Sequence, residues 1–181
     1  MSETMPDEAK QPVKAILALG SNLGERADTL SLAVADLVDS DAVRLCQVSQ
    51  VVQTKPVGGP EGQPDFLNMV IEVETTLEPY ELLAHCNAVE DKHHRVREVR
   101  WGPRTLDVDI ITYGDLEMDE ERLTIPHKLA AERAFVLQPW AWMDPEATLR
   151  GESVAVLAQK ALDAEGLEPY APRDDSWESS S

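Results

Sequence analysis

The chain of 181 residues has 16 Lys and Arg against 34 Asp and Glu, which gives a net charge of −18 with histidine neutral, and 43% of its residues are hydrophobic. This length and apolar content suit one domain of ordinary size with a real core, and do not indicate wholesale disorder. The strong negative charge disfavours nonspecific binding to nucleic acid or to an anionic membrane.

The two ends and the two cysteines bear on localisation. Residues 1–12 are acidic and polar rather than a secretion signal, and no apolar run reaches the roughly 18 residues that a membrane-spanning helix needs. We therefore expect a cytoplasmic protein with a flexible extension at 1–12, a folded domain at 13–170 and a flexible Ser- and Asp-rich tail at 171–181. Cys46 and Cys86 form no CxxC pair, which predicts two buried thiols rather than a zinc site or a disulfide framework.

The first half of the chain contains signals for three strands and one helix. Residues 14–19 are an apolar run ended by a glycine, which predicts a buried strand. Apolar residues at helical spacing over 26–38 predict an amphipathic helix. Residues 43–53 and 67–74 are rich in β-branched side chains and predict two antiparallel neighbouring strands. Six of the twelve residues at 54–65 are Gly or Pro, which predicts a long loop that is functional or disordered.

The second half begins with a helix that we expect to start near Pro79 and to end before the Trp-Gly-Pro at 101–103. Residues 106–113 predict a strand, and weaker strands are expected near Leu116 and Leu123. Two further helices are predicted at 130–142 and 154–164.

The predicted order of elements is strand, helix, strand, strand, helix, strand. This order is typical of a ferredoxin-like α/β sandwich, a single domain with a central, mainly antiparallel sheet. Because that fold hosts many activities, function must be argued from particular residues.

A basic segment at residues 92–104 stands out in this acidic chain. It holds five of the sixteen basic residues and a single acid, Glu98. Arginine side chains match phosphate oxygens in geometry as well as charge, so the segment is a candidate phosphate clamp. The alternative is a solvated helix end, where cations interact favourably with the helix dipole.

Two carboxylates follow the basic segment. Asp107 and Asp109 lie in a predicted strand, where residues two apart project from the same face. Such a pair can ligate a hard cation such as Mg²⁺ together with substrate phosphates. The alternative is simple pairing with Arg100 and Arg104. A carboxylate pair beside an arginine cluster suits phosphoryl transfer, although the chain has neither a GxxxxGK[ST] nor a GxGxxG phosphate-binding motif.

Four segments together resemble one enzyme family. ALGSNLGER (18–26), QTKPVGGPEGQPDFLNMV (53–70), RWGPRTLDVDI (100–110) and RLTIPH (122–127), in this order, resemble the 6-hydroxymethyl-7,8-dihydropterin pyrophosphokinases of folate biosynthesis. The resemblance spans roughly residues 15 to 145. It implies a monomeric enzyme that transfers pyrophosphate from ATP to the hydroxymethyl group of the pterin and releases AMP, with no nucleic acid or membrane partner.

The resemblance also implies roles for individual residues. Two Mg²⁺ ions would bind to Asp107 and Asp109, and Arg95 and Arg97 would act with them in catalysis. The implied ATP-binding residues are Asn87, Glu90, Arg95, Trp101, Arg104, Ile110, Arg122, Thr124, His127 and Arg133. The implied pterin-binding residues are Thr54, Pro56, Val57, Phe66, Asn68, Trp101 and Phe135. Lys55, His94, Phe66 and Lys128 depart from residues that are frequent in the family.

Two other functions compete with this interpretation. One is a different Mg²⁺-dependent nucleotide-using transferase, for example a nucleotidyltransferase that would release pyrophosphate instead of AMP. The other is a noncatalytic ferredoxin-like binding module, for example for RNA, which the acidic charge and the lack of an RNP-like aromatic strand motif disfavour.

Overall fold

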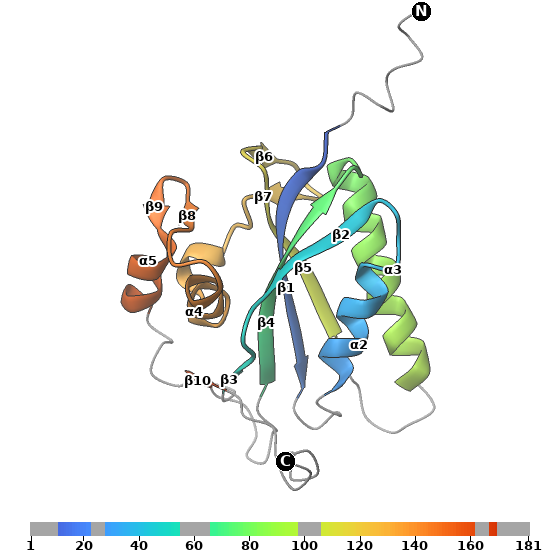
Figure 1. Ribbon diagram of the computed structural model, residues 1–181, viewed down its shortest axis with the longest axis horizontal. Helices are drawn as coiled ribbons and strands as arrows, with labels where there is room; N and C mark the ends of the chain where they lie inside the picture. Colours follow the sequence, from blue (N-terminus) through green and yellow to red (C-terminus); the bar gives the residue numbers. More distant parts are fainter. Residues whose placement is uncertain (1–10, 23–27, 55–65, 98–105, 162–166, 170–181) are drawn as a thin grey trace, which may run out of the picture.

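The computed structural model describes residues 11–22, 28–54, 66–97, 106–161 and 167–169, and in them a six-stranded sheet forms the centre of the fold (Figure 1). All of its strand pairs are antiparallel, in the order β10-β3-β4-β1-β5, and β2 also pairs with the long strand β4. The strands are β1 (Val13–Asn22), β2 (Val43–Val48), β3 (Val52–Thr54), β4 (Phe66–Thr75), β5 (Leu106–Tyr113) and β10 (Leu167–Pro169).

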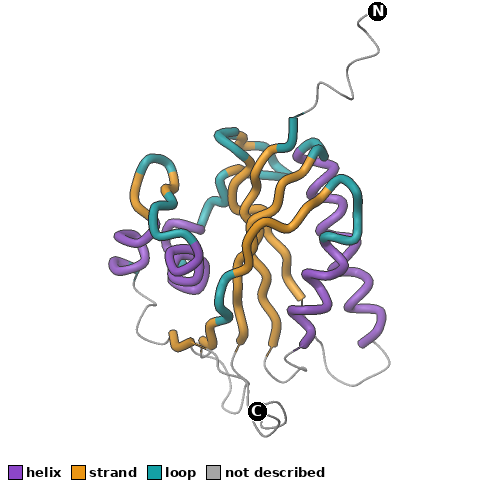
Figure 2. The backbone as a smooth tube through the Cα atoms, in the orientation of Figure 1, coloured by secondary structure: helices purple, strands orange, loops and turns teal. Residues whose placement is uncertain are grey.

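Helices cover both faces of the sheet (Figures 1 and 2). On one side lie α2 (Asp28–Leu37) and α3 (Pro79–Arg97), and on the other lie α4 (Ala134–Met143) and α5 (Val154–Lys160), preceded by the short 3-10 helix η2 (Ala130–Glu132). Two small hairpins, β6 (Met118–Asp119) with β7 (Thr124–Ile125) and β8 (Thr148–Leu149) with β9 (Glu152–Ser153), complete the described fold.

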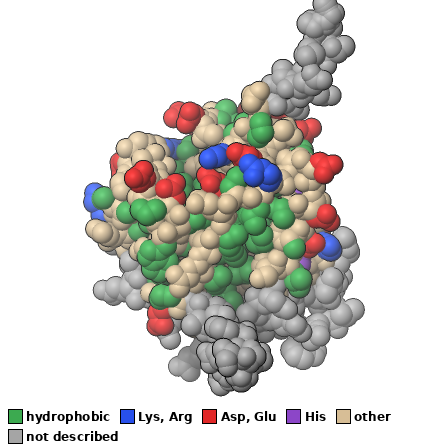
Figure 3. Space-filling view, viewed as in Figure 1, with side chains coloured by type: hydrophobic (Ala, Val, Ile, Leu, Met, Phe, Trp, Pro, Cys, Tyr) green, Lys and Arg blue, Asp and Glu red, His purple; other side chains and the backbone are tan. Residues whose placement is uncertain are grey.

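Alternation along the central strands separates two apolar cores. Leu17 and Leu19 of β1 pack with α2 and α3. Ile16, the residue before Leu17, is on the opposite face of the strand and packs with α4 and α5. Because successive side chains of a strand point to opposite faces, this alternation fixes which residues each face presents. Acidic side chains are spread around the outer part of the face shown in Figure 3, and hydrophobic atoms gather in its middle.

Most of the elements predicted from the sequence are confirmed, with some differences in extent. The predicted strand at 106–113 is β5, and the predicted strands at 43–53 and 67–74 pair antiparallel. The stretch 43–53 is, however, two strands, because the chain leaves β4 after Val48 and returns to it at Val52. Residues 130–142 likewise divide into η2 and α4, and α5 ends at Lys160 rather than at 164. The domain limits 13 and 170 stay predictions.

The prediction of two buried thiols is right for Cys86 and wrong for Cys46. Cys86, on α3, is fully buried, and desolvation, with the charges of Glu90 and Asp109, raises the pKa of its thiol to about 12. Cys46 is only half-buried. The register between β2 and β4 shifts between Leu45 and Gln47, so Cys46 is the extra residue of a β-bulge and is not packed against a cross-strand partner.

One carboxylate ties the C-terminal half of α3 to α2. Asp36 accepts a hydrogen bond from Lys92 Nζ at 2.9 Å on one oxygen and bonds His93 Nε2 at 2.8 Å through the other. Burial alone would raise the pKa of Asp36, but the hydrogen bonds from Lys92 and His93 outweigh it, so the pKa lies below its ordinary value of 3.8. The charged carboxylate is therefore the form that holds the two helices together.

Asp36→Asn should lower the free energy of unfolding by about 1 kcal/mol at pH 7, because an amide accepts weaker hydrogen bonds from Lys92 and His93. A carboxyl whose pKa is depressed on folding stabilises above its unfolded pKa, and that stability is lost as the pH falls through the folded pKa. Urea unfolding should thus show the two proteins converging below about pH 3.8. Glu74→Gln, at the exposed ion pair with Arg44, is the matched control. A difference that stays constant down to pH 2 would contradict the account.

Candidate active site at the edge of the central sheet

A row of three paired residues crosses the sheet near the ends of β1 and β4. Asp107 on β5 lies opposite Gly20 on β1, and Gly20 lies opposite Asn68 on β4. Paired residues project from the same face, so the carboxylate of Asp107 and the amide of Asn68 share the face that α4 covers, with about 10 Å between their strands.

Gly20 has no side chain, and this leaves room for the Asn68 amide. A Cβ at position 20 would lie 2.7 Å from Asn68 Oδ1, closer than real Cβ contacts come. Asn68 is 9% exposed, and its Nδ2 lies 3.5 Å from Thr54 Oγ1. The missing side chain of Gly20 therefore lets the amide lie over β1, on the side toward Asp107.

Asp107 and Asp109 project from one face of β5, as the sequence predicts. Asp107 is exposed and Asp109 is half-buried, and small residues, Gly20 and Ala18, lie opposite them on β1. In the part of the chain that the structure describes, no group of three or more His, Cys, Asp or Glu residues could hold a metal ion. Among the described residues the two aspartates thus form a donor set of two carboxylates.

Glu90 of α3 fixes the backbone between the two aspartates. Its Oε2 accepts a hydrogen bond from the N–H of Val108 at 2.7 Å. Among the described strands, β5 is the last on this side of the sheet, so no described strand pairs with its outward N–H groups. The Glu90 carboxylate meets one of them and holds β5 against α3 at the position between Asp107 and Asp109.

A cavity of about 320 Å³ lies beside Asp109, between the edge of β5, α3 and the residues around β7. Its lining includes five residues that the resemblance implies for metal or ATP, which are Asp109, Ile110, Arg122, Thr124 and His127. Leu83, Val108, Leu123 and Leu129 add apolar walls, and Glu121 and Lys128 complete it. The cavity therefore combines cations and apolar surface, which suits a nucleotide.

His127 reaches this cavity because of a bulge in β5. The register between β1 and β5 shifts at Ile111, and the carbonyl of Ile111 accepts the backbone N–H of His127 at 2.9 Å. The ring Nδ1 accepts the N–H of Leu129, so a neutral ring holds its proton on Nε2. Burial lowers the pKa of His127, with Arg133 adding to this effect and Asp109 opposing it, which favours the neutral ring as a hydrogen-bond donor at Nε2.

Aromatic and polar residues gather on the Asn68 side of the row. Thr54 on β3 lies opposite Phe66 on β4, and both share the face of Asn68. Phe135 on α4 is half-buried against the core of that face, and the guanidinium carbon of Arg133 lies 5.5 Å from the centre of its ring. Four of the seven residues implied for the pterin thus come from neighbouring elements on one face.

The remaining implied residues are Asn87, which the structure describes, and residues whose side chains or whole positions it does not describe. Asn87 is exposed on α3 and is not among the residues that line the cavity. Arg95 and Arg97 belong to the last turn of α3, at the same end of the fold as the start of β5 (Figure 1), but their side chains lie outside the described residues. Pro56, Val57, Trp101 and Arg104 lie outside them entirely.

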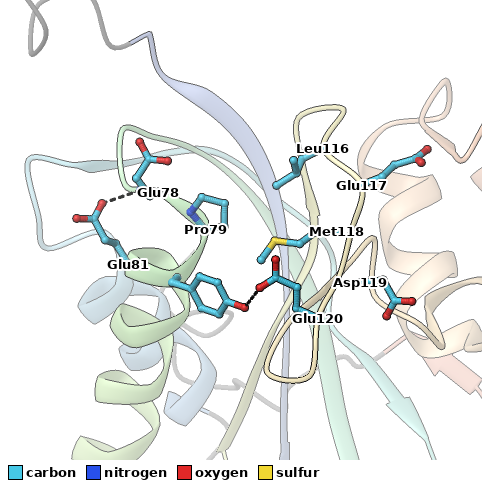
Figure 4. A pocket seen from close by; sticks show the side chains of 9 residues that line it. Glu78, Pro79, Glu81, Leu116, Glu117, Met118, Asp119 and Glu120 are labelled. Carbon is cyan, nitrogen blue, oxygen red and sulfur yellow. Dashed lines mark hydrogen bonds between the residues drawn. The ribbon is translucent and has the colours of Figure 1, made fainter.

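A larger cavity, of about 640 Å³, lies between the start of α3 and the segment that contains β6 (Figure 4). Five of its nine lining residues are carboxylates, which are Glu78, Glu81, Glu117, Asp119 and Glu120. Phosphate groups would be repelled there. The smaller cavity beside Asp109, which contains Arg122 and His127, is therefore the better candidate for an anionic substrate.

Comparisons with known proteins identify the family of this chain. The family model of 7,8-dihydro-6-hydroxymethylpterin-pyrophosphokinase matches residues 16–145, which include every described site residue named above. This chain belongs to that family.

Individual relatives extend over most of the chain. The 2-amino-4-hydroxy-6-hydroxymethyldihydropteridine pyrophosphokinase of Methylorubrum extorquens is 40% identical over 155 residues, covering 86% of this chain and 97% of the relative. The Bacillus subtilis enzyme of the same name is 46% identical over 127 residues, 70% of this chain and 75% of the relative. That of Synechocystis is 37% identical over 163 residues, 87% and 80% of the two chains.

Solved structures show the same fold. The Plasmodium falciparum HPPK-DHPS wild type with pterin and p-hydroxybenzoate superposes with a TM-score of 0.67 at 14% identity, over 93% of this chain and 48% of the other. This chain thus spans about half the length of the Plasmodium protein. No helix among the described residues is long and apolar enough to cross a membrane.

Gly20→Ala should weaken pterin affinity by about 1 to 3 kcal/mol, because the new Cβ displaces the Asn68 amide that it would meet at 2.7 Å. ATP affinity should change little, since the cavity beside Asp109 does not include Asn68. Calorimetric titrations with each ligand measure both effects.

Asn68→Ala is the control for this prediction, because it removes the atom that the Cβ meets. Adding Gly20→Ala to Asn68→Ala should cost much less than Gly20→Ala alone. Equal losses of ATP and pterin affinity in the single variant would show a general disturbance of the sheet instead.

Proposed function

We propose that this protein transfers the pyrophosphate of ATP to the hydroxymethyl group of 6-hydroxymethyl-7,8-dihydropterin, giving the dihydropterin pyrophosphate and AMP for folate biosynthesis. One observation supports this best. The carboxylate pair of β5 has on one side the cavity that contains Arg122 and Lys128. On the other side, across Gly20, lies the group formed by Asn68, Thr54, Phe66 and Phe135, here called the Asn68 corner. Family membership supports the same reaction.

The nucleotide is assigned to the cavity beside Asp109. Arg122 and Thr124 line it, and His127 offers its Nε2 proton to a phosphate oxygen. Ile110 gives an apolar surface, and Arg133, whose charge acts on His127, neutralises further phosphate charge. We propose that Asn87 and Glu90 act from α3, with Glu90 keeping β5 in place through Val108.

Asp107 and Asp109 are the residues that would hold magnesium. Two carboxylates without a third protein ligand among the described residues fit Mg²⁺, which usually keeps one or two carboxylates and completes its shell with water and substrate phosphates. When bound, two such ions would neutralise the phosphate charge and activate the pterin hydroxyl. The role of the chain is to keep both carboxylates on one face of β5, with Asp109 lining the cavity.

The pterin is assigned to the Asn68 corner. A flat heterocycle with alternating donors and acceptors suits the amide of Asn68 and the hydroxyl of Thr54, with Phe66 and Phe135 as apolar surfaces. We propose that Pro56, Val57 and Trp101 complete this pocket. A pterin bound there would have its hydroxymethyl group toward Asp107, across Gly20.

In the proposed reaction the pterin hydroxyl oxygen attacks the β-phosphorus of ATP and loses its proton. The bond from the β-phosphorus to the oxygen that bridges it to the α-phosphorus breaks, and AMP leaves. We propose that Arg95, Arg97, Trp101 and Arg104 stabilise the charge on the transferring group, because α3 ends at the end of the fold where β5 starts. We also propose that the enzyme works as a cytoplasmic monomer.

Product analysis tests the proposal. Incubation with ATP, Mg²⁺ and 6-hydroxymethyl-7,8-dihydropterin should yield AMP and the pterin pyrophosphate in equal amounts. Release of inorganic pyrophosphate with AMP left on the substrate would indicate a nucleotidyltransferase. RNA binding without nucleotide turnover would indicate a noncatalytic module.

Asp109→Asn should lower kcat about 100-fold or more, because it removes one charge from the donor set without changing its shape. Pterin affinity should stay within about twofold, since Asp109 lies outside the Asn68 corner. Initial-rate assays at saturating Mg²⁺ measure kcat, with Asp115→Asn in the exposed turn after β5 as the matched control. Near-normal kcat in Asp109→Asn would remove the aspartate from the metal site.

A further inference from the structure

Arg122 lines the nucleotide cavity, and it forms no ion pair with an acidic residue in the described part of the chain. The ion pairs between described residues join Arg44 with Glu74 and Asp36 with Lys92 and His93, and none of them includes Arg122. Instead, the guanidinium carbon of Arg122 lies 5.0 Å from the centre of the Tyr80 ring, well within the range of a cation–π contact. An aromatic ring from α3 therefore meets the cation from the β6–β7 segment.

Tyr80 is itself held in place at the start of α3. Its hydroxyl donates a hydrogen bond to Glu120 Oε1, marked by the dashed line to Glu120 in Figure 4, and this bond, followed by burial, raises the pKa of Tyr80. The first turn of the helix is closed by Glu81, whose carboxylate accepts the N–H of Glu78 at 2.7 Å. The ring is thus anchored to both elements that Arg122 lies between.

The same contacts limit where Arg122 can go. Glu120 and Glu121 are its neighbours in the chain, and an arginine beside two carboxylates would ordinarily pair with one of them. Here the carboxylate of Glu120 accepts a hydrogen bond from the Tyr80 hydroxyl instead. A guanidinium that stacks on a ring keeps its N–H groups free at the edge, where they can meet the oxygens of a phosphate.

We propose that Tyr80 is a positioning residue that holds the Arg122 guanidinium in the nucleotide cavity, ready for a phosphate oxygen of ATP, and that Glu120 fixes the ring for this purpose. The inference rests on the proposed binding of ATP beside Asp109. It assigns the nucleotide affinity of this chain in part to a residue outside the cavity, since Tyr80 is not among the lining residues.

A double-mutant cycle on nucleotide affinity tests the proposal. Equilibrium binding of a nonhydrolysable ATP analogue, with Mg²⁺, is measured for the wild type, Tyr80→Leu, Arg122→Ala and the double variant. Tyr80→Leu should weaken binding about two- to fivefold, and the double variant should bind no more weakly than Arg122→Ala, because the ring acts only through the arginine. In turnover, Tyr80→Leu should raise the KM for ATP and leave kcat nearly unchanged.

Two further variants separate positioning from a general effect on structure. Tyr80→Phe keeps the ring face and should recover most of the affinity that Tyr80→Leu loses. Tyr113→Leu removes another half-buried tyrosine, whose hydroxyl donates to the carbonyl of Leu77, and its effect should simply add to that of Arg122→Ala. Melting temperatures of all variants show which of them keep the fold.

Additive losses for Tyr80→Leu and Arg122→Ala would overturn the proposal, as would unchanged affinity in Arg122→Ala. These outcomes can be distinguished from a failure of the proposed reaction. If the wild type makes AMP and the cycle is additive, only the role of Tyr80 is wrong. If the two variants are coupled but no pterin pyrophosphate forms, Tyr80 positions Arg122 for a nucleotide that serves another reaction.

Discussion

The register of β1 between β4 and β5 is the constraint on which the site depends. A slip of β1 by one residue would turn Gly20 and Ala18 to the opposite face and put larger side chains beside Asp107, Asp109 and Asn68. Leu17 and Leu19 prevent this, because their burial against α2 and α3 fixes the opposite face for Gly20 and Ala18. The carboxylates and the amide thus take their places from the apolar core, rather than from contacts with one another.

The helices on the far side of the sheet supply supports for the site. Glu90 of α3 bonds the backbone between the two aspartates, and Asp36 of α2 holds α3 through Lys92 and His93. The functional side chains of β5 are therefore on the face of the sheet that α4 covers, and the residues that fix the strand come from α2 and α3 on the opposite face. This division explains how an edge strand, which lacks a neighbour on one side, can present two carboxylates in a defined position.

Periodicity in the sequence predicts the parts of this arrangement that depend on local pattern. Alternation over residues 106–113 predicts both β5 and the common face of Asp107 and Asp109, and each is confirmed. Contacts between elements distant in the chain leave no such signal. The bond from Glu90 to Val108, the clearance at Gly20 and the stacking of Arg122 on Tyr80 all depend on packing, and Cys46 is half-buried because of a bulge that the alternation of its strand conceals.

The central claim is that the carboxylate pair and the Asn68 amide face the same space across Gly20. Paramagnetic broadening by Mn²⁺, added with a nonhydrolysable ATP analogue, measures this in solution through the side-chain amide signals of the protein. Asn68 should broaden strongly, because about two strand spacings, near 10 Å, separate its strand from β5, whereas Gln47 on the outer strand β2 should broaden much less. An unaffected Asn68 signal at saturating Mn²⁺ and nucleotide would contradict the account.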